Sequence, residues 1–70
     1  MILYAVKYQN HYLRDKKELG VALLPMDHCS VYTNDVDAKK LADKFAKPGT
    51  ILIQFTLQEK EIPWPIILHG

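Results

Sequence analysis

The chain has 70 residues, of which 49% are hydrophobic and 24% charged, a composition typical of one small globular domain that excludes a disordered chain. Its formal net charge of +1 provides no bulk attraction to nucleic acid or to an anionic membrane. The single cysteine, Cys29, excludes an internal disulfide, and a core of this size supplies only about 3–5 kcal/mol, so we expect docking onto a partner or a second copy.

The sequence indicates no targeting segment. The apolar run at residues 1–6 lacks a basic lead and is too short for a signal peptide. No stretch approaches the ~18 apolar residues of a membrane-spanning helix. Together with the free thiol of Cys29, these features favour a cytoplasmic protein without a membrane partner.

The N-terminal segment is predicted to form a β-hairpin. Residues 2–8 alternate between two faces, as expected of a strand. Gln9-Asn10 is a turn signal, because Asn tolerates the left-handed backbone of a tight hairpin. Residues 11–13 would then form a short return strand.

Two further segments precede the helix. Residues 14–20 carry a run of mixed charges, which predicts a solvated turn, with a contact loop as the alternative interpretation. Residues 21–24 form a short apolar run that ends at Pro25, which is typical of a buried or edge strand.

The clearest pattern is a helix over residues 35–46. Asn34 is its predicted N-cap, because its side chain can accept hydrogen bonds from unpaired backbone N–H groups. Pro48 and Gly49 are predicted to end the helix and to reverse the chain. The apolar residues of the helix have the spacing of one buried stripe: Ala38, Leu41, Ala42 and Phe45.

Residues 50–58 alternate cleanly, which predicts a strand with one buried face. Ile51, Ile53 and Phe55 point to the same side of this strand. Because the link to the helix is short, we expect the helix to lie over these three side chains.

The C-terminal segment 62–70 is apolar but interrupted by two prolines, so it does not predict a central strand, although residues 66–68 could pair at a sheet edge. Trp64 lies between Pro63 and Pro65. Two interpretations are open: Trp64 is a rigidly presented anchor for a partner, or it folds back and closes the core.

The sequence offers little chemistry for catalysis. Asp27-His28-Cys29 is the most suggestive triplet, but adjacent residues of an extended segment point in opposite directions, so His28 is poorly placed to activate Cys29. No metal-ligand spacing and no phosphate-binding glycine loop occur. We therefore predict a non-enzymatic protein without a metal or cofactor.

Residues 7–17 interleave basic and aromatic side chains, a mixture that binders of single-stranded nucleic acid use. Acidic residues are interspersed, however, and no RNA-binding motif is present. Nucleic-acid binding through this segment is therefore the alternative functional interpretation.

Three short motifs give the chain a resemblance to small proteins encoded by bacteriophages and mobile elements. They are Tyr4-Ala5-Val6-Lys7, Tyr12-Leu13, and the Asp-led helix start Asp37-Ala38-Lys39. The resemblance implies a strand, a hairpin and one helix on a small sheet. It also implies a modulator that binds and inhibits a host protein or a defence complex, and it transfers no functional residue.

Together these patterns predict a single α+β domain over residues 1–70, with an antiparallel sheet of about three to five short strands and one helix on one face. The predicted core consists of Tyr4, Val6, Leu23, Leu41, Phe45, Ile51, Ile53 and Phe55. The predicted function is an interaction module that binds a larger protein, with self-association as a further expectation. The predicted contact residues are Trp64, Tyr8, Tyr12, Arg14, Lys16 and Lys17.

Overall fold

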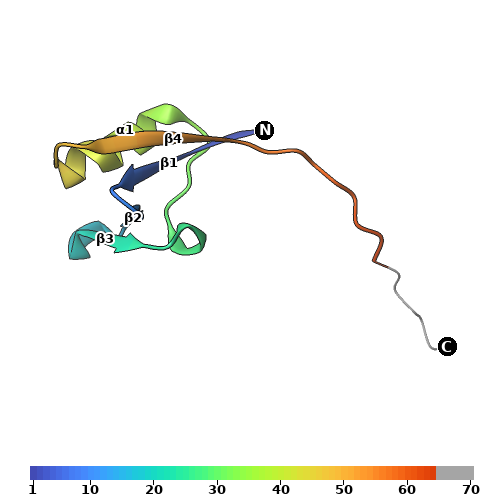
Figure 1. Cartoon of the computed structure of the whole chain (residues 1–70), viewed down its shortest axis with the longest axis horizontal. Helices are drawn as coiled ribbons and strands as arrows, with labels where there is room; N and C mark the ends of the chain where they lie inside the picture. The colour runs from blue at the N-terminus through green and yellow to red at the C-terminus, as the bar shows by residue number, and fades with distance from the viewer. Residues whose placement is uncertain (65–70) are drawn as a thin grey trace.

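The computed structural model describes residues 1–64 and shows a four-stranded antiparallel sheet with one α-helix packed against it (Figure 1). The predicted α+β fold is therefore confirmed. The prediction that residues 66–68 pair at a sheet edge lies outside the described residues. The elements are the strands β1 (Ile2–Tyr8), β2 (His11–Asp15), β3 (Val21–Leu24) and β4 (Thr50–Thr56), the helix α1 (Asp35–Phe45), and the short 3-10 helices η1 (Lys17–Leu19) and η2 (Met26–His28).

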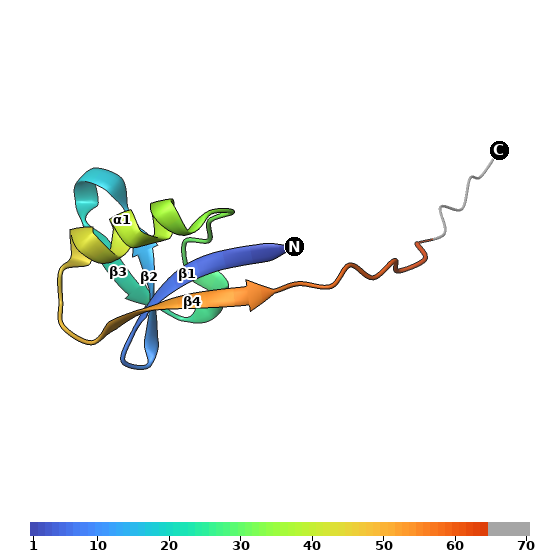
Figure 2. The same ribbon diagram turned by 90° about the horizontal axis from the view of Figure 1, so that it is seen from above.

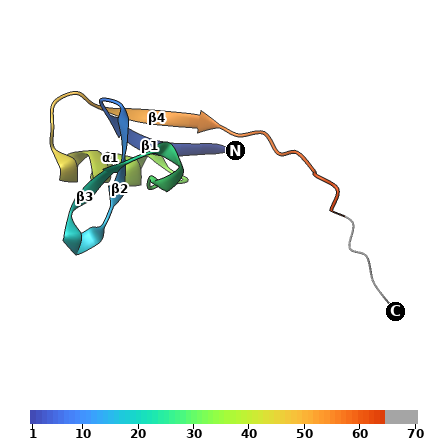
Figure 3. The same ribbon diagram turned by 60° about the horizontal axis from the view of Figure 1, so that its bottom comes forward.

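The sheet has the strand order β3-β2-β1-β4, so the N-terminal strand lies inside the sheet while β3 and β4 form its edges. β1 and β4 pair along the full length of both strands. β1 and β2 pair only beside their turn, at Lys7 and Tyr8. Farther from the turn, Tyr32 takes the place of β2 and exchanges two backbone hydrogen bonds of 2.8 Å with Tyr4. β2 therefore diverges from β1, and Figure 3 shows β2 and β3 running at a steep angle to β4.

The start of α1 is held by side-chain hydrogen bonds. As predicted, Asn34 is the N-cap: its Oδ1 accepts from the Asp37 N–H at 2.9 Å, and its Nδ2 donates to the Asp37 carboxylate at 2.9 Å. One turn along the helix, Lys39 Nζ lies 2.8 Å from the Asp35 carboxylate. Both acidic residues lie in the first turn, where the helix dipole favours negative charge.

The turns differ from the prediction in the residues that adopt the left-handed backbone. The helix ends at Phe45 because Ala46 takes φ 54° and donates its N–H to the Ala42 carbonyl at 2.9 Å, which satisfies an end carbonyl. The predicted helix over residues 35–46 therefore agrees with α1 and its C-cap, and Gly49, with φ 87°, adopts the left-handed region in the reversal that follows, as predicted. In the hairpin between β1 and β2, Asn10 was predicted to adopt the left-handed backbone. The residue that adopts it is Gln9, with φ 54°.

The core lies between α1 and the face of the sheet that it covers. Val6 of β1, Leu13 of β2, and Ala38 and Leu41 of α1 form one cluster with at most 2% of each residue exposed. Partly buried side chains surround this cluster: Tyr4, Tyr8, Val21, Tyr32, Ala42 and Phe45. The domain is therefore held together by a small core, as expected for its length.

The prediction that α1 covers Ile51, Ile53 and Phe55 is wrong. Cross-strand partners lie on the same face of a sheet, and Val6, which packs against the helix, pairs with Leu52. The odd-numbered residues of β4 therefore lie on the opposite face, where Ile53 pairs with the fully buried Ala5.

The predicted core is correct for part of its members. Val6 and Leu41 are buried, and Tyr4 and Phe45 are half-buried against them. Two other members are exposed rather than buried, Leu23 at 39% and Ile51 at 51%. The buried residues that the prediction missed are Ala5, Leu13 and Ala38.

Candidate interaction surfaces

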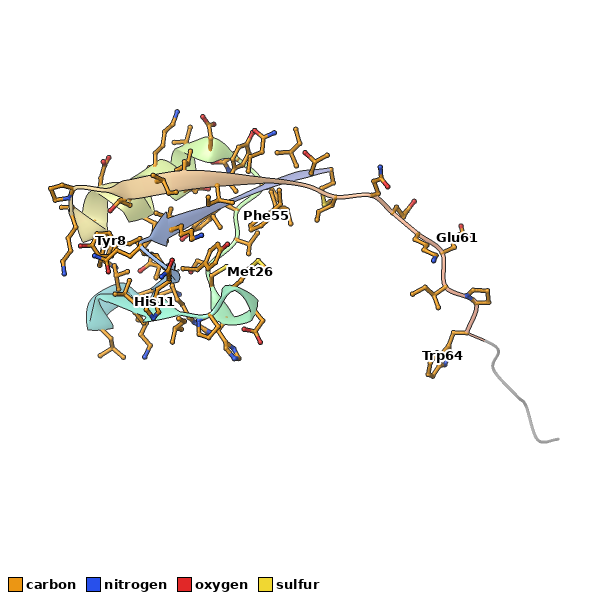
Figure 4. The ribbon with its side chains drawn as sticks, viewed as in Figure 1. Tyr8, His11, Met26, Phe55, Glu61 and Trp64 are labelled. Carbon is orange, nitrogen blue, oxygen red and sulfur yellow. The ribbon has the colours of Figure 1, made fainter. Side chains whose placement is uncertain are left out.

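After β4, Leu57 still exchanges hydrogen bonds with Met1, and residues 58–64 then run away from the domain (Figure 1). At the end of this segment Trp64 is 85% exposed. Figure 4 shows its side chain beyond Glu61, well clear of the sheet and the helix. Of the two interpretations of Trp64, the structure therefore agrees with an indole outside the core.

The sequence around Trp64 limits its backbone freedom. Pro63 has a fixed φ, and the proline that follows Trp64 in the sequence disfavours helical geometry at Trp64 itself. Ile62, next to this pair, is also strongly exposed. A large apolar side chain on a preorganised segment loses little conformational entropy when it binds, which is the property of an anchor residue.

Tyr8 lies on the helix side of the sheet and belongs to the border of the core. Its ring packs edge-to-face against Phe45, with 5.1 Å between ring centroids and 69° between ring planes. Lys47 Nζ lies 5.8 Å from the Tyr8 centroid and 5.1 Å from the Phe45 centroid. This arrangement joins the C-terminal end of α1 to β1, so the half-buried Tyr8 has a structural role.

Tyr12 lies on the opposite face of the sheet. It pairs across the strands with Lys7, whose Nζ lies 5.4 Å from the centroid of its ring. Because Tyr8 follows Lys7 by one position on β1, its side chain points to the helix side, and the two tyrosines do not form one surface.

The charged segment after β2 is attached to the rest of the domain. Lys44 of α1 donates from Nζ to the Asp15 carboxylate at 2.6 Å and to the Lys17 carbonyl at 2.6 Å. Arg14 Nη1 donates to the His28 carbonyl at 3.4 Å. Lys16 and Lys17 have exposed side chains. The geometry is that of a solvated turn held against the helix.

The ion pair between Lys44 and Asp15 predicts a stability change in acid. The hydrogen bond from Lys44 holds the pKa of the Asp15 carboxyl below its ordinary value of 3.8. A lowered carboxyl pKa contributes stability that is complete above 3.8 and is lost as the pH falls through the lower folded value.

We therefore expect Asp15→Asn to lower the urea midpoint at neutral pH and to have a smaller effect in acid, at pH values below 3.8. Asp43→Asn, which changes an exposed carboxylate on the same helix as Lys44, serves as the control. An Asp15→Asn effect that stays constant down to the acid limit would show that the ion pair is not the cause.

The triplet Asp27-His28-Cys29 lies in and after η2. His28 Nε2 and the Asp27 carboxylate are 3.7 Å apart, and both side chains are exposed. Burial raises the pKa of the Cys29 thiol, which disfavours the thiolate that a nucleophile or a metal ligand requires. Within residues 1–64, no group of three or more His, Cys, Asp or Glu side chains is placed to hold a metal ion.

The structure thus distributes the predicted contact residues over separate places. Tyr8 closes the core border, Tyr12 lies on the helix-free face, and Trp64 lies at the end of the extended segment. Arg14 lies within β2, which extends to Asp15 and so shortens the turn predicted over residues 14–20, and Lys16 and Lys17 follow the strand at a third place. Among the predicted contact residues, only Trp64 combines high exposure with a large apolar surface.

A surface that the sequence prediction missed is β4. Its odd-numbered apolar residues were placed under the helix, whereas the structure leaves Ile51 half in solvent. The even-numbered Leu52 is 39% exposed on the other face. One feature of the sequence could have identified this surface: residues 48–58 include no charged residue, which is unusual for a strand that borders water.

The one α-helix among the described residues is too short and too polar to cross a membrane. Comparisons with family models, curated proteins and solved structures find no match to this chain. Function is therefore argued from the geometry of the chain itself.

Proposed function

We propose that this protein is a non-enzymatic interaction module that binds a larger protein through Trp64. The observation that carries the proposal is an 85% exposed indole, next to a proline, on a segment outside the fold. Contiguous exposed apolar surface on a small protein marks interaction sites, and tryptophan is enriched among the residues that dominate binding energy. Ile62, two residues before Trp64 in the sequence, is also exposed.

The test is capture of a partner by the immobilised full-length chain from a lysate of its native cell. We expect Trp64→Ala to weaken this capture by about 30-fold or more, since an anchor tryptophan contributes about 2 kcal/mol or more. The circular dichroism spectrum and the thermal midpoint are expected to stay unchanged, because Trp64 makes no core contact.

Leu19→Ala is the matched control for this experiment. Leu19 is 83% exposed, as apolar surface in η1, within the charged segment that was the other candidate contact loop. We expect Leu19→Ala to leave capture unchanged. Loss of capture with Leu19→Ala but not with Trp64→Ala would place the contact on the loop, and absence of any captured protein would contradict the interaction function.

The single tryptophan also provides a direct signal. In the free protein its fluorescence is expected to be typical of an indole in water and readily quenched by acrylamide. Addition of the purified partner should shift the emission to the blue and protect it from the quencher. An emission that is already blue-shifted in the free protein would contradict an exposed Trp64.

Nucleic-acid binding through residues 7–17 stays a prediction. The two tyrosines of that segment lie on different faces of the sheet, so they do not provide a single stacking platform beside the basic side chains. The further proposal of a phage-derived cytoplasmic inhibitor of a host protein or defence complex is supported by the motif resemblance and the free thiol alone.

A further inference from the structure

The two edges of the sheet differ in how they are protected. β3 has four residues and is followed by Pro25, and short edges and prolines are devices that prevent strands from pairing with other chains. β4 has seven residues, pairs with β1 without a bulge, and contains neither proline nor a charged side chain. Figure 2 shows β4 at the outer edge of the sheet beside β1. Among residues 1–64, no strand covers its outer side.

The hydrogen bonds around β1 show which backbone groups of β4 face outward. Tyr4 directs its N–H and its carbonyl to Tyr32, on the side of β1 away from β4, whereas the Leu57 N–H donates to the Met1 carbonyl at 2.8 Å. Successive residues of an antiparallel strand direct these groups to alternate sides. The odd-numbered residues of β4 therefore bond to β1. The groups left for the free edge belong to Leu52, Gln54 and Thr56, together with the carbonyl of Thr50, whose N–H donates to the Lys47 carbonyl at 3.3 Å.

We propose that β4 pairs with β4 of a second copy of this chain, antiparallel about a twofold axis at Ile53. Because only even-numbered residues have outward N–H and carbonyl groups, each hydrogen-bonded pair must join even to even. The register with Leu52 opposite Gln54 of the second copy is the one that overlaps the whole strand. Two four-stranded sheets then become one continuous sheet.

The side chains of β4 are complementary to themselves in this register. On the helix-free face, Ile51 lies beside Phe55 of the second copy, and Ile53 lies beside its own equivalent. Because β4 is uncharged, no like charges oppose one another, and the apolar pairs cover surface that is now half in solvent. A second copy satisfies these conditions without any further assumption about a partner. The edge is separate from Trp64, so this dimer does not depend on the proposed function.

The full-length chain is tested by sedimentation over a concentration series. We expect a dimer, twice the 8.1 kDa chain mass, that dissociates on dilution. The double variant Leu52→Lys/Gln54→Lys sets lysine opposite lysine twice in the dimer. The dissociation constant of the dimer should therefore rise by about tenfold or more. Both side chains are exposed, so the variant should keep the wild-type circular dichroism spectrum.

The register is tested by cross-linking in a Cys29→Ser background. Residues directly opposite one another at Ile53 are close enough for a disulfide, so Ile53→Cys should give a covalent dimer on mild oxidation. In the same register Ile51→Cys lies four residues from its equivalent, about 13 Å along the strand, and should remain monomeric under denaturing conditions.

Three results would overturn the proposal. They are a monomer at every concentration, a dimer that the double lysine variant leaves intact, or a dimer that is abolished by Trp64→Ala instead. The last result would assign self-association to the extended segment.

Discussion

Leu13→Ala is expected to leave most of the chain unfolded under conditions in which the wild-type protein is folded. Leu13 is fully buried, and with Val6 it is one of the two largest fully buried side chains among the described residues. Removing a buried leucine side chain costs about 2–5 kcal/mol, because the transfer energy is lost and a cavity remains. A domain of this size has only about 3–5 kcal/mol in total, so the loss approaches the whole free energy of unfolding.

The measurement is urea denaturation followed by circular dichroism. Leu23→Ala is the matched control, because Leu23 is the cross-strand partner of Leu13 on β3 but is 39% exposed. Leu23→Ala should lower the free energy of unfolding clearly less than Leu13→Ala does. Equal losses for the two variants would contradict the position of the core between α1 and the middle of the sheet.

The second large effect is expected for Leu41→Ala. α1 has 11 residues, fewer than the ~12–15 that an isolated helix needs to be even marginally stable in water, so packing of its apolar stripe maintains it. Leu41 is the largest side chain of α1 in the buried cluster and is 2% exposed. We expect a loss of about 2–5 kcal/mol, with the helical signal and the sheet signal lost in one transition.

Val36→Ala provides the control for Leu41→Ala on the same helix. Val36 is 55% exposed, so its replacement should change the free energy of unfolding by at most about 0.5 kcal/mol. Circular dichroism and tyrosine fluorescence, recorded on the same samples, show whether the helix and the sheet unfold together. A separate loss of helix would contradict a single cooperative core.

The helix could be predicted from the sequence because its signals are local. The Asn34 side chain caps the nearby Asp37 N–H, and the spacing of Leu41 and Phe45 defines the buried stripe within the helix. The position of β4 was predictable for the same reason, from alternation within one segment. The end of the helix was less predictable, because Ala46 adopts a left-handed conformation that its residue type does not favour.

The face of β4 that packs against the helix was predicted wrongly, because the alternation identifies the more apolar face of the strand but not the element that covers it. The register with β1 decides the question: Val6 pairs with Leu52, which places Ile53 and Phe55 on the opposite side. A shift of one residue would reverse the assignment, and no local pattern determines that shift. Leu13 was missed for a related reason, since a short strand in a charged surrounding shows no clear buried face.

For the candidate surfaces, the sequence selected Trp64 by its residue type and its flanking prolines but left open whether it was core or contact. The tertiary structure places the indole outside the core, because Leu13, Ala38 and Leu41 complete the buried cluster without it. It also placed Tyr8 and Tyr12 on different faces of the sheet, although their closeness in the sequence had suggested one surface.

The sequence by itself determined the elements of this protein: the capped helix, the alternating strand after it and the proline-bounded tryptophan. These features depend on residues within a few positions of one another, so local spacing and backbone preference are sufficient. Tertiary structure alone decided which face of β4 is buried, which strand forms the unprotected edge and which aromatic side chain stays in water. Those outcomes depend on pairing between β1 and segments about 30 to 50 residues away in the chain, and such pairing is set by the packing of the whole domain.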